Sequence, residues 1–189
     1  TLTVTIGRRL AVVAAVVAAL FALGAELSRA ARARRRASRD LQIALAAEIR
    51  AYVAALAPFD YEAYGAEMAR RMAEAEDAGE RFVPFVPRER NATVFRALLA
   101  DLPALPEGVI DGVVIYYQQV EAIAALAEDL GREDYARLSA SRRAEVYGSY
   151  LAMKQEALRL GRLALDDLAA SLETPRRRLS SPASGRSGR

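Results

Sequence analysis

The sequence predicts an all-α protein, in which an N-terminal transmembrane helix continues into a stalk and is followed by an antiparallel helical bundle with a proline-containing strap. Three observations lead to this fold class. Residues 10–25 (LAVVAAVVAALFALGA) form an unbroken apolar run. Hydrophobic residues make up 53% of the 189-residue chain, which is enough for a packed core. Beyond the run, apolar residues recur at helical spacing over much of residues 41–173.

Changes in composition along the chain predict five segments. They are a short N-terminal segment (1–9), a transmembrane helix (10–28), an arginine-rich juxtamembrane collar (29–40), an α-helical bundle domain (41–173) and a disordered basic tail (174–189). No Gly or Pro lies between Ala25 and Ala57, so the membrane helix is expected to continue through the collar into the bundle.

Residues 10–28 are long enough to span a bilayer. Nineteen positions lie between Arg9 and Arg29, and at about 1.5 Å per residue they cover about 28 Å, close to the thickness of the hydrocarbon core. Both arginines can extend their guanidinium groups to the interfaces. A cleaved signal peptide, with a cleavage site near Gly24, and a buried helix of a soluble protein are the alternatives. The arginine cluster that follows opposes translocation and disfavours cleavage.

Small residues recur at every fourth position of the predicted membrane helix, at Ala11, Ala15 and Ala19. Such spacing lets a second transmembrane helix approach closely, so this face is a candidate packing surface. The alternative is that the spacing only reflects an alanine-rich composition.

Six arginines follow the apolar run: Arg29, Arg32, Arg34, Arg35, Arg36 and Arg39. The positive-inside rule places this collar, and the chain after it, in the cytoplasm. Its predicted partners are the anionic headgroups of the bilayer. At 100° per residue, all but Arg34 fall within an arc of about 120°, and the apolar side chains of residues 41–56 lie on a roughly opposite face. The collar is therefore expected to face away from the core.

The charge of the chain is divided unevenly. Residues 40–174 hold 14 basic and 23 acidic residues, whereas the flanks hold 13 basic residues and one acid, Glu26. Because an acidic body repels phosphate, nucleic acid is not an expected partner.

Pro58 is expected to end the first helix, and a second helix is predicted over residues 60–77, with Asp60 as its N-cap and Gly79 after its end. The prolines of the next stretch, RFVPFVPRERN (81–91), exclude a helix and favour an extended strap over the bundle. Its apolar side chains are expected to be buried, and if exposed they would form a candidate partner site. The residues of this strap are Phe82, Val83, Pro84, Phe85, Val86 and Pro87.

Three further helices complete the predicted bundle. Asn91 is expected to cap a short helix that ends near Asp101. Residues 107–130 carry apolar residues at helical spacing and are predicted to be the central core helix. In the last helix, 141–173, leucines recur at every seventh residue: Leu151, Leu158, Leu165 and Leu172. Lys154 and Gly161 would disfavour a dimeric zipper, so packing within the bundle is expected.

The chain contains no cysteine and no histidine. This excludes disulfides, thiolate catalysis, the usual zinc sites and histidine-dependent catalytic groups. No catalytic residue, cofactor or metal ligand is predicted. An enzyme without a recognisable motif is the third alternative for function, and it would depend on carboxylates, tyrosines, arginines or Lys154, brought together from distant helices.

The order of apolar anchor, arginine-rich stalk, PFVP strap and VFRALLADLPALPEGVIDGVVIYYQQVEAI resembles small, uncharacterised single-pass bacterial membrane-anchored α-helical proteins, mainly over residues 82–126. The resemblance implies an anchored helical module of bacterial or phage origin, and it carries no catalytic residues over to this chain. The predicted function is a cytoplasm-facing interaction or scaffold protein of the bacterial inner membrane, such as an accessory subunit of a membrane assembly, with an unidentified protein partner. Homo-oligomers are left open. An exported or periplasmic helical protein is the alternative.

Overall fold

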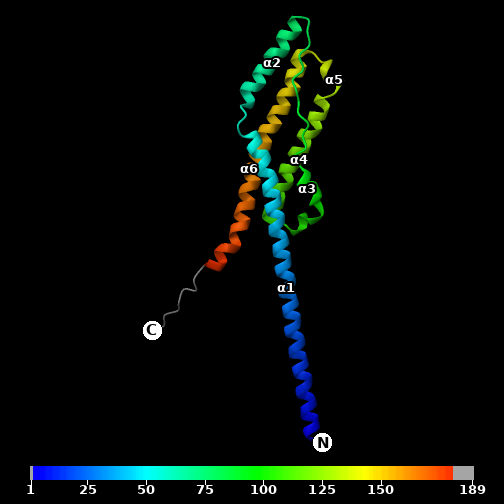
Figure 1. Ribbon diagram of the computed structural model, residues 1–189, viewed down its shortest axis with the longest axis vertical. Coiled ribbons are helices and arrows are strands. Elements are labelled where there is room, and N and C mark those ends of the chain that lie inside the picture. Colours follow the sequence, from blue (N-terminus) through cyan, green and yellow to red (C-terminus); the bar gives the residue numbers. More distant parts are fainter. Residues whose placement is uncertain (1, 181–189) are drawn as a thin grey trace, which may run out of the picture. The chain divides into compact units, whose positions relative to one another are not determined.

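The computed structural model describes the backbone of residues 2–180 and the side chains of residues 20–173. Within this part of the chain every regular element is a helix, as Figure 1 shows. The elements are α1 (Leu2–Leu56), α2 (Tyr61–Asp77), α3 (Thr93–Ala97), the 3₁₀ helix η1 (Leu99–Ala104), α4 (Glu107–Leu130), α5 (Glu133–Ala136) and α6 (Ala140–Ser180). The chain divides into two compact units, Thr1–Asp40 and Leu41–Arg189.

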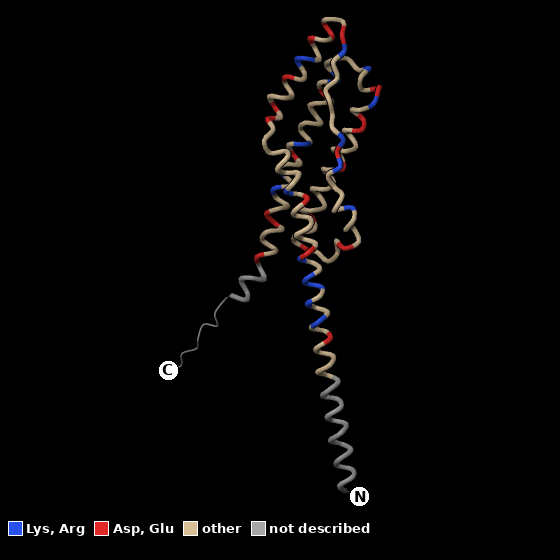
Figure 2. The backbone as a smooth tube through the Cα atoms, viewed as in Figure 1, with Lys and Arg blue, Asp and Glu red and all other residues tan. Residues whose placement is uncertain are grey.

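The first unit is helical throughout its described residues, as its content of alanine and arginine predicts. All the side chains of residues 20–40 are exposed except Ser38, which is half-buried. Figure 2 marks the arginine run as a series of blue stretches along α1. The unit therefore presents a helix with apolar side chains at residues 20–27 and basic ones from residue 29 onward.

The core of the second unit begins with one face of α1. The predicted apolar stripe is confirmed, since Leu41, Leu45, Ile49, Tyr52 and Leu56 are all buried. The helix ends at Leu56, two residues before Pro58, because proline removes an amide donor and clashes with the preceding turn.

Helix α2 begins and ends as predicted. The Asp60 carboxylate accepts a hydrogen bond of 3.0 Å from the backbone N–H of Ala63, which makes Asp60 the N-cap. After Ala78, Gly79 adopts a φ of +74°, a left-handed conformation that L-residues with a side chain rarely adopt. Tyr61, Met68 and Met72 are buried in the core.

The prediction of α4 as the central core helix is also confirmed. Its buried residues are Val109, Val113, Tyr116, Tyr117, Val120, Ile123, Ala127 and Leu130. It packs most extensively on α6, which also packs on α2. Gln119 donates a hydrogen bond of 3.0 Å to the Met153 carbonyl, while Gly112 lies against Ala164. Residue numbers thus rise in opposite directions along the two helices, so they run antiparallel.

The seam of α6 is shifted from the predicted leucine heptad by one residue. Leu151 is buried, but Leu158, Leu165 and Leu172 are only partly buried. The buried positions are instead Tyr147, Tyr150, Ala157, Gly161, Ala164 and Leu168. Small residues occupy the middle of this seam because aromatic residues of the neighbouring helices fill the space: a Cβ on Gly161 would lie 3.0 Å from Cε2 of Tyr116.

The prediction that Asn91 caps a short helix is wrong. The N-cap of α3 is Ala92, which has no side chain able to cap. The carboxylate of Glu48, a residue of α1, caps α3 instead, because it accepts hydrogen bonds from the backbone N–H groups of Val94 (2.7 Å) and Phe95 (3.0 Å). Glu48 also accepts a hydrogen bond of 2.7 Å from the Tyr117 hydroxyl, and the Tyr117 ring stacks on Phe95. One carboxylate of α1 thus orders both α3 and part of α4.

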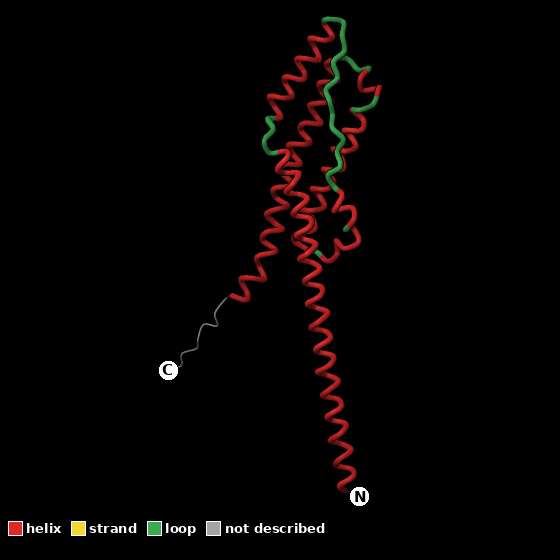
Figure 3. Tube along the Cα trace, viewed as in Figure 1, coloured by secondary structure: helices red, strands yellow, loops and turns green. Residues whose placement is uncertain are grey.

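The segment 81–91 is the longest stretch without helix among the described residues, and Figure 3 shows it in green between α2 and α3. Side chains alternate along it. Phe82 and Val86 pack against the core and Pro84 is buried, whereas Val83 and Phe85 are exposed. The expected burial is therefore correct for Phe82 and Val86 and wrong for Val83 and Phe85, because an extended chain points successive side chains to opposite sides.

Candidate functional site

Residues 20–27 of the first unit carry a cluster of exposed apolar side chains. Phe21 is 77% exposed, and Leu20, Leu23 and Leu27 are exposed by more than half. Ala11, Ala15 and Ala19 of the predicted helix-packing surface lie outside the residues whose side chains are described. The same holds for most of the predicted apolar run. The side chains described begin at Leu20, so only the last residues of the run, from residue 20 onward, are seen, and they are exposed.

The six arginines of the collar are all exposed. Arg29 forms an ion pair with Glu26, and Arg32 donates a hydrogen bond of 3.1 Å to the Ser28 carbonyl. Among the described residues, no ion pair or hydrogen bond involves the guanidinium groups of the other four, Arg34, Arg35, Arg36 and Arg39. The collar thus offers several unneutralised guanidinium groups, each able to bind a phosphate or carboxylate through two parallel N–H···O bonds.

One helix of the described chain, α4, is long and apolar enough to cross a membrane, and a second span results if residues 20–56 of α1 are counted together with α2, to which they are joined at a bend of 54°. This test uses length and composition only. A helix at the centre of a bundle has the same composition, and α4 has eight buried residues.

The second unit contains a buried polar centre around Glu89, whose side chain is 5% exposed. Its Oε1 lies 2.8 Å from Nζ of Lys154 on α6 and accepts a hydrogen bond of 2.9 Å from the Tyr150 hydroxyl. Its Oε2 accepts hydrogen bonds from the Tyr52 hydroxyl of α1 (3.2 Å) and from the side-chain amide of Asn91. Both carboxylate oxygens are therefore occupied by donors from three parts of the chain.

Lys154 is the only lysine in the sequence, and its side chain is 14% exposed. Besides its ion pair with Glu89, its ammonium lies 5.1 Å from the centroid of the Tyr150 ring, within the range of a cation–π interaction. The contacts of Glu89 with Lys154 and Tyr150 of α6, and with Tyr52 of α1, hold the segment 81–91 against these two helices. A carboxylate with four donors has no free lone pair aimed at a substrate, so this arrangement favours a structural role over general base catalysis.

The buried tyrosines of this centre have perturbed acidity. The pKa of Tyr52 and that of Tyr150 are raised well above the ordinary value of 10.0, first by burial and then by the negative charge of Glu89. Both effects disfavour the phenolate. The two hydroxyls therefore remain donors to Glu89 over the whole physiological pH range.

These raised values predict alkaline destabilisation. The unfolded tyrosines lose their protons near pH 10.0, whereas the folded ones retain them, so the stability that they contribute is complete below pH 10 and is lost as the pH rises towards the folded pKa. We expect the free energy of unfolding to fall above about pH 10, and to fall less steeply in Tyr150→Phe. Urea titrations at several pH values, with tyrosine ionisation followed by ultraviolet absorbance, measure this. Ionisation of all tyrosines near pH 10 in the folded protein would contradict it.

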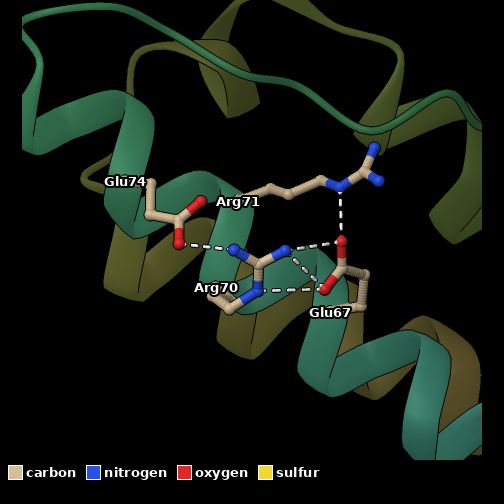
Figure 4. A network of polar contacts seen from close by, with 4 residues as sticks. All are labelled: Glu67, Arg70, Arg71 and Glu74. Carbon is tan, nitrogen blue, oxygen red and sulfur yellow. Dashed lines mark hydrogen bonds and ion pairs between the residues drawn. The ribbon is translucent and has the colours of Figure 1, made fainter.

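A second polar network lies on the surface of α2 (Figure 4). Glu67 accepts hydrogen bonds from Nη2 of Arg70 (2.8 Å) and Nε of Arg71 (2.6 Å), and Arg70 also pairs with Glu74. The two arginines lower the pKa of Glu67, chiefly through these hydrogen bonds. All the pairs are three or four residues apart on one exposed helix face, which is the usual pattern of helix stabilisation. We assign no functional site here.

The sequence signal for the Glu89 centre was a single residue. Lys154 stands in a chain that otherwise uses arginine, and it lies one heptad before Gly161 on the seam of α6. The partner Glu89 sits among arginines and prolines, and no spacing links it to position 154. In the described part of the chain no group of three or more acidic residues could hold a metal ion.

Comparison with known proteins adds no relative to this description. No protein-family model, no curated protein and no solved structure matches the chain.

Proposed function

We propose that this chain is a membrane-anchored helical interaction or scaffold protein, held in a bacterial inner membrane by residues 10–28, with its bundle in the cytoplasm. One observation carries the proposal: the large apolar side chains of residues 20–27 are exposed and are followed at once by the exposed arginines of residues 29–39. Water disfavours such a helix, whereas a bilayer with anionic headgroups stabilises both parts.

The proposed role is interaction, with anionic lipid and a protein partner as ligands, and without catalysis or a cofactor. The polar centre supports this, since Glu89 and Lys154 neutralise each other and tie segments of the bundle together. In its more specific form, the proposal is that the anchored bundle is an accessory subunit of a membrane assembly.

Reporter fusions after residue 189 test the anchor and its orientation in bacterial cells. We expect a fluorescent protein that folds only in the cytoplasm to be active, alkaline phosphatase to be inactive, and the chain to stay in the membrane fraction after alkaline extraction. Phosphatase activity would favour the exported or periplasmic alternative. Extraction without detergent would contradict the anchor.

The collar is predicted to set the orientation. Replacing Arg29, Arg32, Arg34, Arg35 and Arg36 with glutamine is expected to weaken or invert the orientation, because the excess of positive charge after the apolar run is then lost. The same pair of reporters measures the change. The matched control replaces five exposed arginines of the bundle, Arg132, Arg137, Arg142, Arg159 and Arg162, and is expected to leave the topology unchanged. An unaltered topology in the collar variant would count against this role.

A further inference from the structure

The outward-facing side of the segment 81–91 combines apolar and basic side chains. Phe85 is 83% exposed and Val83 is also exposed, while Phe82, Pro84 and Val86 face the bundle. The segment is fixed at one end by Glu89, whose carboxylate binds Lys154, Tyr150 and Tyr52. Phe85 is therefore displayed on an anchored segment and cannot fold into the core without displacing its neighbours.

Three exposed arginines, Arg81, Arg88 and Arg90, accompany these apolar residues. Among the described residues none of the three forms an ion pair or a hydrogen bond. The bundle pairs most of its other exposed arginines with acids: Arg70, Arg71, Arg96, Arg132, Arg137, Arg142 and Arg159. The one acid within the segment, Glu89, is buried and already neutralised by Lys154. The outer side is thus basic, on a domain that is otherwise acidic.

The backbone of the segment is also unpaired. Residues 81–91 form no helix. Within the described chain, none of their backbone N–H or C=O groups takes part in a backbone–backbone hydrogen bond. A bilayer interior disfavours such open groups, because lipid tails supply no hydrogen-bonding partners. An extended peptide supplies them and can place alternate side chains on Phe85 and Val83.

We propose that residues 81–90 are a docking surface for an extended acidic segment of a partner protein, in which carboxylates and apolar side chains share one face of the extended chain. Its carboxylates pair with Arg81, Arg88 and Arg90, and its apolar side chains cover Phe85 and Val83. The inference rests on the proposed role as an interaction protein, and it names the chemistry of the protein partner.

Fluorescence anisotropy tests this with the full chain in phosphatidylcholine nanodiscs. The probe is a labelled peptide, Glu-Ser-Val-Ser-Phe-Ser-Glu-Ser-Glu, which places its glutamates, valine and phenylalanine on one face when extended, and its counterpart has lysine in place of each glutamate. We expect saturable binding of the acidic peptide only, weakened by salt. Replacing Arg81, Arg88 and Arg90 with serine, or Phe85→Ser, is expected to reduce the affinity by about tenfold or more. Circular dichroism checks that these surface variants fold.

The controls match each change. The first control replaces three arginines that already form ion pairs, and so removes the same amount of charge: Arg132, Arg137 and Arg142, each changed to serine. The second control, Leu163→Ser, removes an exposed apolar side chain from α6. Both are expected to bind the peptide like the unmodified chain. No binding of the acidic peptide, equal binding of the lysine peptide, or equal loss in the control variants would overturn the proposal.

Lipid is the competing ligand, and a separate arm distinguishes it. If the variants of the segment 81–90 abolish binding of added phosphatidylglycerol vesicles and leave peptide binding unaffected, the surface binds membranes and the proposal is wrong. The topology assay is independent of both arms. A failure of peptide binding with the predicted topology intact overturns the docking surface alone, and a failure of the topology overturns the anchor.

Discussion

Replacing Glu89 with leucine is expected to lower the free energy of unfolding by about 3–5 kcal/mol, because it leaves the buried ammonium of Lys154 without its counter-charge. The hydroxyls of Tyr52 and Tyr150 lose their acceptor at the same time. Urea-induced unfolding of the full chain in detergent, followed by circular dichroism, measures the change.

Two variants separate the buried charge from a general effect of removing a glutamate. Glu121→Leu removes the same group from an exposed ion pair with Arg96, and we expect only a small change. Combining Glu89→Leu with Lys154→Met removes both buried charges and is expected to recover much of the lost stability. Unchanged stability of Glu89→Leu alone would show that the centre does not hold the bundle together.

Replacing Gly161 with leucine is expected to cost about 3 kcal/mol, since the position has no room for a side chain. A Cβ there would lie 2.5 Å from Cγ2 of Val53 and 3.0 Å from Cε2 of Tyr116. Valine has one preferred rotamer in a helix, so it cannot turn aside, and the helices must separate. Thermal and urea unfolding of the full chain measure the loss.

Gly148 is the matched control on the same helix. A Cβ at Gly148 meets nothing within 4 Å, so Gly148→Leu is expected to raise the free energy of unfolding by up to about 1 kcal/mol through helix propensity. The two substitutions should therefore change stability in opposite directions. A gain in both would show that the close contact at Gly161 is relieved without cost.

The helices themselves could be predicted because their signals are local. Asp60 caps α2 through a hydrogen bond within its own first turn, and Pro58 ends α1 through a clash with the preceding turn. The buried face of α4 could be predicted from the 3.6-residue period alone, because its buried residues, such as Val109, Val113 and Val120, recur at helical spacing.

The contacts between helices could not be predicted in the same way. The leucine heptad of α6 is a sound local pattern, but the neighbouring helices leave room only for small residues in the middle of the seam, at Gly161 and, one position before two of the leucines, at Ala157 and Ala164. Asn91 is a good N-cap by residue type. Its side-chain amide donates to Glu89 instead, and the backbone N–H groups at the start of α3 donate to Glu48 of α1.

The candidate sites also differ in how far the sequence could predict them. The sequence alone determined that the chain is helical, that a long apolar run precedes six arginines, and that histidine and cysteine chemistry is absent. Periodicity and composition are properties of neighbouring residues, so they can be seen without a structure. Only the tertiary structure decided that Glu89 is buried against Lys154 and that Phe85 faces outward between unpaired arginines. Burial and charge pairing depend on residues 65 positions apart, such as 89 and 154, and only folding brings these together.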